Sequence, residues 1–289
     1  MNNKSTSYLD KIRSPYIFQN IFIIVRNFKR KLEIVRYNKY LQRRLGVDIT
    51  QYKMFAIIEI ELIPAKNKYG KFININNQEE EQYFHIYFND SNEEINRNYL
   101  LENEKIDKIK IIIDFKVTSF YELFSYCECI ESISFTNFYK KNINNMSFMF
   151  YKCTSLTKIN FSNYITMNVE NMSCMFYECS LLKELDLSNF NTDNVTDMSN
   201  MFYQCNKLEK LDMTNFNTEN VKNMKEMFFG CSSLREINIT KFNTESLKNH
   251  DNMFKKGSDE LIEKFKLLDK YSKLFDKRHN YWDDFDLLN

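Results

Sequence analysis

CSLLKELDLSNFNTDNVTDMSNMFYQ, residues 179–204, is one copy of a 26-residue unit that repeats from residue 127 to residue 256. Five cysteines mark the first position of each unit: Cys127, Cys153, Cys179, Cys205 and Cys231. Position 24 is phenylalanine in every unit: Phe150, Phe176, Phe202, Phe228 and Phe254. Self-similarity at a fixed period of this length indicates stacked repeats, because one such unit buries its apolar face only against its neighbours.

Each unit combines two apolar periodicities. Leu185 and Leu187 alternate with polar residues, which is the pattern of a short strand with one buried face. Positions 20, 23, 24 and 27 are apolar, as in a helix of about two turns, and the Asn or Asp at position 19 is a natural N-cap. The sequence therefore predicts an α/β solenoid of about five units, each a strand, a turn and a short helix.

Two further columns are interpreted as structural. Asparagine recurs at position 16, and we expect its side chain to bond backbone groups of neighbouring coils; the column includes Asn168, Asn194 and Asn220. The column cysteines are small enough to fill the core and are expected to be buried and reduced. Cys127 and Cys129 form no metal motif with a second pair, so no metal site is predicted.

The unit, L-x-x-L-D-L-S-N-F-N-T-x-N-V-T-D-M-S-x-M-F-x-x-C, resembles the BspA-like leucine-rich repeat family over residues 127–256. The resemblance implies a right-handed solenoid and a role in adhesion or protein binding, and its members are often surface proteins. The first unit departs from the pattern, because Phe138-Tyr139-Lys140-Lys141 replaces the F-N-T-x segment.

The flanking sequence divides the chain into four predicted parts: a helical head at 8–54, a β cap with a lead-in half unit at 55–126, the repeats at 127–256, and a C-terminal helical cap at 257–289. Strands are expected at Phe55–Ile63, Phe72–Ile75 and Tyr83–Phe88, and Ile109–Phe115 is expected to supply the first strand of the stack. The half unit is indicated by Val117, Phe120, Leu123 and Phe124. The C-terminal helix is predicted over Leu261–Leu274, with Ser258 as N-cap.

The head contains two predicted helices. One begins at Ser14-Pro15, and the other spans Lys31–Leu45 and ends at Gly46. Residues 14–46 loosely resemble an F-box, which implies docking to an adaptor subunit of a ubiquitin ligase. The alternative is a helical hairpin that packs on the β cap.

Charge and motifs narrow the function classes. The chain has 40 Lys and Arg against 39 Asp and Glu, so its net charge of +1 gives no reason to expect nucleic acid. It lacks a membrane-length apolar run, and Tyr16–Val25 is a poor signal peptide, so a cytoplasmic location is predicted, with the cell surface as alternative. His85, His250 and His279 lie in no catalytic or metal motif. We expect no enzyme and no cofactor.

A protein partner is expected on the outward-facing positions of the strands, which form one sheet face in stacked repeats. This strand face is polar and mixed in sign. Its predicted contact residues are Lys158, Asn160, Lys183, Glu184, Asp186, Lys210, Asp212, Glu236 and Asn238.

Overall fold

The computed structural model of the 289-residue chain describes residues 57–75, 77–114, 117–138, 143–161, 166–238 and 242–266. The chain divides into two compact units, residues 1–56 and 57–289, and all described residues belong to the second. The predicted helical hairpin and the F-box-like segment therefore lie outside the described residues.

The first part of the described chain is a mixed sheet with the strand order β3-β5-β1-β6-β7, antiparallel from β3 to β6 and parallel between β6 and β7. The strands β2 and β4 pair antiparallel and form a separate two-stranded ribbon. The bounds are β1 (Ile58–Pro64), β2 (Gly70–Lys71), β3 (Phe84–Phe88), β4 (Tyr99–Leu100), β5 (Ile109–Ile113), β6 (Ile130–Phe138) and β7 (Lys158–Asn160). A single turn of 3-10 helix, Glu81–Tyr83, leads into β3.

The prediction that the run at Ile109–Phe115 supplies the first strand of the stack is wrong. Its β5 segment pairs antiparallel with β1 and β3, and β1 lies between β5 and the first repeat strand, β6. The alternating burial of Ile58, Ile60 and Leu62 explains why β1 can occupy this place, because one apolar face continues the core across the sheet.

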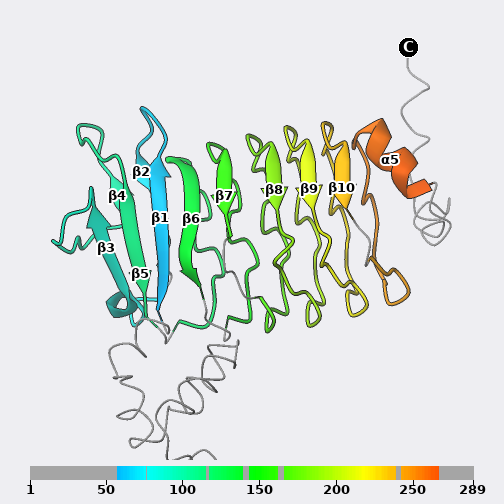
Figure 1. Ribbon diagram of the computed structural model, residues 1–289, viewed down its shortest axis with the longest axis horizontal. Helices are drawn as coiled ribbons and strands as arrows, with labels where there is room; N and C mark the ends of the chain where they lie inside the picture. The colour runs from blue at the N-terminus through cyan, green and yellow to red at the C-terminus, as the bar shows by residue number, and fades with distance from the viewer. Residues whose placement is uncertain are drawn as a thin grey trace, which may run out of the picture. The chain divides into compact units, whose positions relative to one another are not determined.

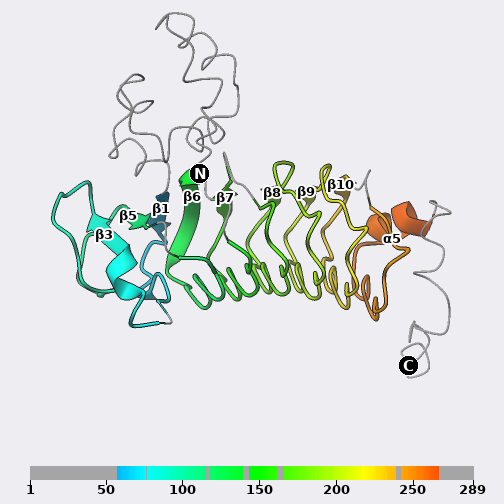
Figure 2. The ribbon, with the colours of Figure 1, turned by 90° about the horizontal axis from the view of Figure 1, so that it is seen from below.

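From β6 onward, successive 26-residue units lie side by side along one row (Figures 1 and 2). The strands β8 (Glu184–Asp186), β9 (Lys210–Asp212) and β10 (Glu236–Asn238) pair parallel, with Leu185 opposite Leu211 and Leu211 opposite Ile237. A second parallel ladder follows position 19, through single-residue bridges such as Asp197 to Asn223. Units are thus bonded to their neighbours along two lines, except between β7 and β8, where the strand line is interrupted.

The short helices predicted within the units are absent from the described residues. In residues 198–204, backbone N–H groups alternate between two kinds of acceptor. The Phe202 N–H bonds the Met227 carbonyl of the next coil at 2.9 Å, whereas the Tyr203 N–H bonds Asn200, three residues back, at 3.2 Å. An α-helix would instead bond every N–H to the carbonyl four residues back. The segment is therefore a series of tight turns joined to the neighbouring coils.

These turns require left-handed backbone at two positions of each unit. Asn200 has φ of 55° and Gln204 has φ of 56°, and the equivalent residues of the other coils have similar angles. The turn geometry still points positions 20, 23, 24 and 27 inward, so Met198, Met201, Phe202 and Cys205 are fully buried. The helical spacing of the apolar residues thus correctly predicts which side chains are buried, but the backbone that carries them is not helical.

The predicted α/β solenoid is therefore a wrong assignment of fold class. The described chain is nearly all strand and turn, arranged in separate small sheets: one of five strands, one of three (β8 to β10) and one of two. The sheet is interrupted between β7 and β8. Among the described residues, only α5 (Asp259–Lys266) is α-helical.

α5 follows the last unit. The Ser258 Oγ accepts a hydrogen bond from the Leu261 N–H at 3.1 Å, and Phe265 packs on Phe254 with ring centroids 4.5 Å apart. Residues 267–274 of the longer helix predicted there, together with Trp282 and Phe285, lie outside the described residues.

Candidate binding surfaces

The interior of the stack consists of side-chain columns, which fix the surface residues in register. The position-24 phenylalanines stack face to face, and Phe202 lies 5.5 Å from Phe176 and 5.6 Å from Phe228 between ring centroids. In the asparagine column, Asn194 donates to the Met167 carbonyl and Asn220 donates to the Asp193 carbonyl, each at 2.7 Å. These asparagines lie on the exposed surface, where their amides bond backbone carbonyls of the preceding coil.

The column cysteines are buried free thiols that serve as weak donors to the preceding coil. The Sγ of Cys205 lies 3.1 Å from the Phe176 carbonyl oxygen, and the Sγ of Cys231 lies 3.0 Å from the Phe202 carbonyl oxygen. Burial raises the pKa of Cys205 to about 12 and raises the pKa of Cys179 and Cys231 well above the ordinary value. Each therefore stays a neutral thiol at physiological pH.

These thiols are expected to resist alkylation until the chain unfolds. Below pH ~8.5, the ordinary cysteine pKa, folded and unfolded thiols are both protonated, so they add no pH dependence. Above it, only the unfolded chain loses protons, so the free energy of unfolding falls as pH rises. Thiol labelling at pH 8 with and without urea, together with urea titrations from pH 7 to 10, measures both effects. Rapid labelling of Cys205 in the folded protein, or native disulfides, would contradict this account.

The predicted strand face is exposed, apart from the half-buried Asp212. At position 6 the charges alternate along the stack: Lys158, Glu184, Lys210 and Glu236. The Lys210 ammonium lies 3.6 Å from the Glu236 carboxylate, so neighbouring charges face each other across adjacent strands. Such a column is largely neutralised within the chain and offers a partner little unbalanced charge.

The next strand-face column, at position 8, has a local structural role. The Asp186 carboxylate accepts a hydrogen bond from the Ser188 N–H at 2.9 Å, and that of Asp212 accepts from the Thr214 N–H at 2.9 Å. Asn238 donates to the Thr214 hydroxyl at 2.8 Å. The two aspartates end their strands by closing Asx turns, and Asn238 bonds the preceding coil, so part of their hydrogen-bonding capacity is already used.

A second surface is formed by an aromatic column at position 25, which the sequence interpretation did not single out. Tyr151, Tyr177, Tyr203 and Phe229 recur at intervals of 26 residues, so comparing this position across the units would have found them. They stack face to face, with ring centroids 4.6, 4.4 and 4.7 Å apart. We call these four residues, with Tyr126 at their N-terminal end, the aromatic row.

The aromatic row is partly exposed, and Tyr126 shows 57% of its surface to solvent. Ring faces within the row cover one another, so it presents mainly ring edges and phenol groups. Burial raises the pKa of Tyr151 to about 12, so its hydroxyl stays protonated well into the alkaline range. Lys152 lies over the Tyr126 and Tyr151 rings at 5.7 and 5.6 Å, and Lys256 lies over Phe229 at 5.7 Å.

A shallow groove of about 250 Å³ runs beside the aromatic row. It combines one carboxylate, two amides and three hydroxyl groups around the edge of a ring. The lining residues are Thr154, Glu178, Ser180, Tyr203, Gln204 and Asn206. Apolar edges next to convergent polar groups match the composition of protein-recognition surfaces.

Catalytic and metal groups are sparse in the part of the chain that the structure describes. No cluster of three or more His, Cys, Asp or Glu side chains there could hold a metal ion. His85 pairs with the Glu94 carboxylate at 2.8 Å on the exposed face of β3. No helix within the same residues has the length and apolar character needed to cross a bilayer.

These observations define a repeat protein whose accessible features are extended surfaces. The chain belongs to the family described as "Mycoplasma protein of unknown function, DUF285", whose family model matches residues 102–183 and 144–265 and so spans more than half of the chain. No curated protein and no solved structure shows a significant match to it.

Proposed function

We propose that this chain is a non-catalytic binding protein whose repeats hold a protein partner through the aromatic row and its adjoining groove. The partly exposed, stacked tyrosines carry the proposal. Tyrosine is enriched among the residues that dominate protein–protein binding energy, because a ring offers a large apolar area and a hydroxyl donor at low entropic cost. The stack also pre-orients these rings, which reduces the ordering cost of association.

The strand face that was predicted as the contact surface is the competing location. Two of its position-6 charges, Lys210 and Glu236, pair across adjacent strands, and its position-8 aspartates close turns. A partner would have to replace those interactions without gaining an apolar anchor. We therefore assign the main contact to the aromatic row.

Two double variants separate the locations. Tyr177→Ser with Tyr203→Ser removes the centre of the aromatic row, and Lys158→Glu with Lys210→Glu changes the strand face. A partner captured by the wild-type chain from its own cells is identified and purified, and its affinity for each variant is measured by calorimetry. Loss of one binding hot spot costs about 2 kcal/mol or more, so the tyrosine variant is expected to bind at least ~30-fold more weakly.

The strand-face variant should bind within about twofold of wild type. Urea unfolding of both variants checks that the fold is retained. Loss of binding only in the strand-face variant would move the site to the strands. Binding that neither double variant changes would contradict a repeat-surface contact.

A surface-adhesion role is the second candidate, and the BspA-like character of the repeat unit favours it. Both roles use the same surface and differ in location. Labelling of intact cells with an impermeant reagent distinguishes them, because an adhesin reacts before lysis and a cytoplasmic protein reacts only afterwards.

A further inference from the structure

The edge strand β3 has one side of its backbone turned away from the sheet. Asn89 donates to the Lys108 carbonyl at 3.0 Å, and Asp114 donates to the Tyr83 carbonyl at 2.8 Å. These bonds place the odd-numbered residues in the hydrogen-bonded pairs with β5. The N–H and carbonyl groups of Phe84 and Ile86 consequently face outward.

The outer side of β3 is only partly covered. The Ile86 carbonyl accepts a hydrogen bond from the Ile95 N–H at 2.8 Å, next to the antiparallel bridge between Tyr87 and Glu94. Continuing that pairing would place Arg97 opposite Phe84. Instead, Asn98 turns to a different strand, where its carbonyl accepts from the Phe72 N–H at 3.0 Å. One rung of the ladder is therefore missing.

Two of the four outward groups are used, because the Ile86 carbonyl accepts from the Ile95 N–H and the Phe84 N–H donates to the Glu81 carbonyl. Among the described residues, neither the Ile86 N–H nor the Phe84 carbonyl has a hydrogen-bond partner. Both belong to buried residues, and a pair of this spacing and orientation is what an added β-strand bonds. Because an unpaired backbone group is costly when it is shielded from water, a ligand that bonds both would gain from them.

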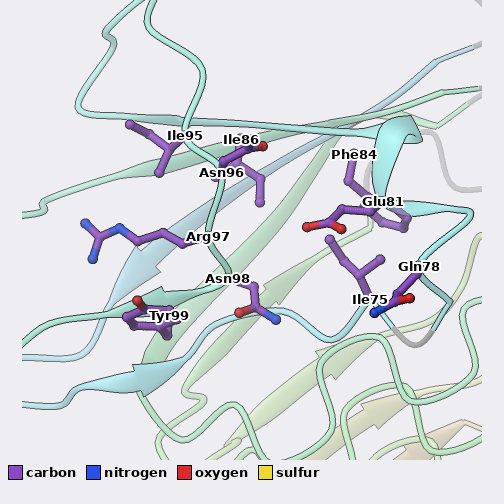
Figure 3. Close-up of a pocket in the computed structure, with 10 residues that line it drawn as sticks. All are labelled: Ile75, Gln78, Glu81, Phe84, Ile86, Ile95, Asn96, Arg97, Asn98 and Tyr99. Carbon is purple, nitrogen blue, oxygen red and sulfur yellow. The ribbon is translucent and has the colours of Figure 1, made fainter.

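A cavity of about 240 Å³ occupies the place of the missing rung. Its apolar lining comes from Ile75, Phe84, Ile86 and Ile95, and the amides of Gln78, Asn96 and Asn98 border it. Figure 3 shows these side chains around one space. An apolar floor with a few polar groups at the rim is typical of a ligand site.

The charge of the cavity is set by Glu81. Its carboxylate points into the space, whereas the Arg97 guanidinium extends away from it (Figure 3). Arg97 is held there by its ion pair with Glu104 and by the rings of Phe88 and Tyr99, 5.2 and 5.6 Å from the guanidinium carbon. The cavity therefore presents one carboxylate and no facing cation among its lining residues.

We propose that this cavity binds a short extended peptide segment of a partner protein, which bonds the two unpaired backbone groups of β3. The segment donates its N–H to the Phe84 carbonyl and accepts from the Ile86 N–H, as in strand addition to a sheet edge. A small apolar side chain rests on Ile86, and a lysine or arginine of the segment faces Glu81. The site shares no residue with the aromatic row, so the two proposals stand independently.

Two capped tripeptides test the site by nuclear magnetic resonance of the full-length chain. The probe is acetyl-Val-Lys-Val-amide, and acetyl-Val-Glu-Val-amide is its charge-reversed match. The lysine probe should shift the Ile86 amide downfield as its new hydrogen bond forms, with saturation, and should bind at least about tenfold more tightly than the glutamate probe.

Two variants at the site and one control variant outside it test the proposal further. Glu81→Lys lies at an exposed position and should reverse the preference between the probes. Ile86→Pro removes the outward N–H, which the pairing with β5 does not use, together with a buried isoleucine side chain; with the fold checked by its amide spectrum, it should abolish binding of both probes. Tyr203→Ser, in the aromatic row, should leave probe binding unchanged. The proposal is overturned if neither probe shifts the Ile86 amide with saturation up to about 10 mM, or if Glu81→Lys leaves the preference as it was.

Discussion

Replacing Phe202 by alanine is expected to lower the free energy of unfolding by about 3–5 kcal/mol, the usual cost of removing a buried phenylalanine. Phe202 is fully buried and stacks on Phe176 and Phe228, with interplanar angles of 4° to each. The cavity cannot close by a shift of one coil, because backbone bonds hold that coil to both neighbours. Urea unfolding followed by circular dichroism measures the change.

Tyr203→Ala is the matched control for this prediction. Tyr203 is the next residue, with rings stacked at 4.4 and 4.7 Å, but it is only partly buried. Its loss should cost less than half as much, because less apolar surface is removed from the interior. Equal costs for the two substitutions would show that position 24 is not the interior of the stack.

Gln204→Val is expected to destabilise the protein by about 2–3 kcal/mol, because a β-branched residue tolerates positive φ poorly. Gln204 has φ of 56°, and at the equivalent position of the next coil Gly230 has φ of 72°. Gln204→Gly should therefore be neutral or stabilising by up to about 1 kcal/mol, since relief of the left-handed backbone outweighs the entropy gained by the unfolded chain. Urea unfolding of both variants measures the difference.

Lys207→Val provides the control for the side-chain change itself. Lys207 is exposed three residues later and has no positive φ, so valine there should cost less than about 0.5 kcal/mol. If Gln204→Val were as mild as Lys207→Val, the left-handed turn at position 26 would be refuted.

The sequence predicts which side chains of the repeat are buried, because apolar columns at fixed spacing must face a common interior. It does not predict where the backbone bonds go. The stripe through Met198, Met201 and Phe202 fits a helix, and it fits the observed turns equally well. The deciding feature is positive φ, and residues such as Glu178 and Lys152 adopt it without a glycine to indicate it. Gly230 is the one glycine at position 26.

The flanking strands β1, β3 and β5 were predictable, but the strand predicted at Phe72–Ile75 is wrong, because the pairing with β4 ends at Lys71, and the topology was not predictable. An apolar run such as Ile109–Ile113 has the same pattern in parallel and antiparallel pairs, so the insertion of β1 beside β6 could not be anticipated. Of the two candidate binding sites, the aromatic row could have been predicted from the sequence, because its residues recur every 26 positions. The cavity beside β3 could not have been predicted, because it forms where the segment Ile95–Tyr99 turns away from β3 after a single backbone hydrogen bond.

Scalar coupling across hydrogen bonds tests the stacked-turn account most directly. In the deuterated, isotope-labelled protein, the amide nitrogen of Phe202 is expected to couple to the carbonyl carbon of Met227 in the next coil, 25 residues ahead. Coupling from Phe202 to the carbonyl of Met198, four residues back, would show a helix at this position and contradict the account.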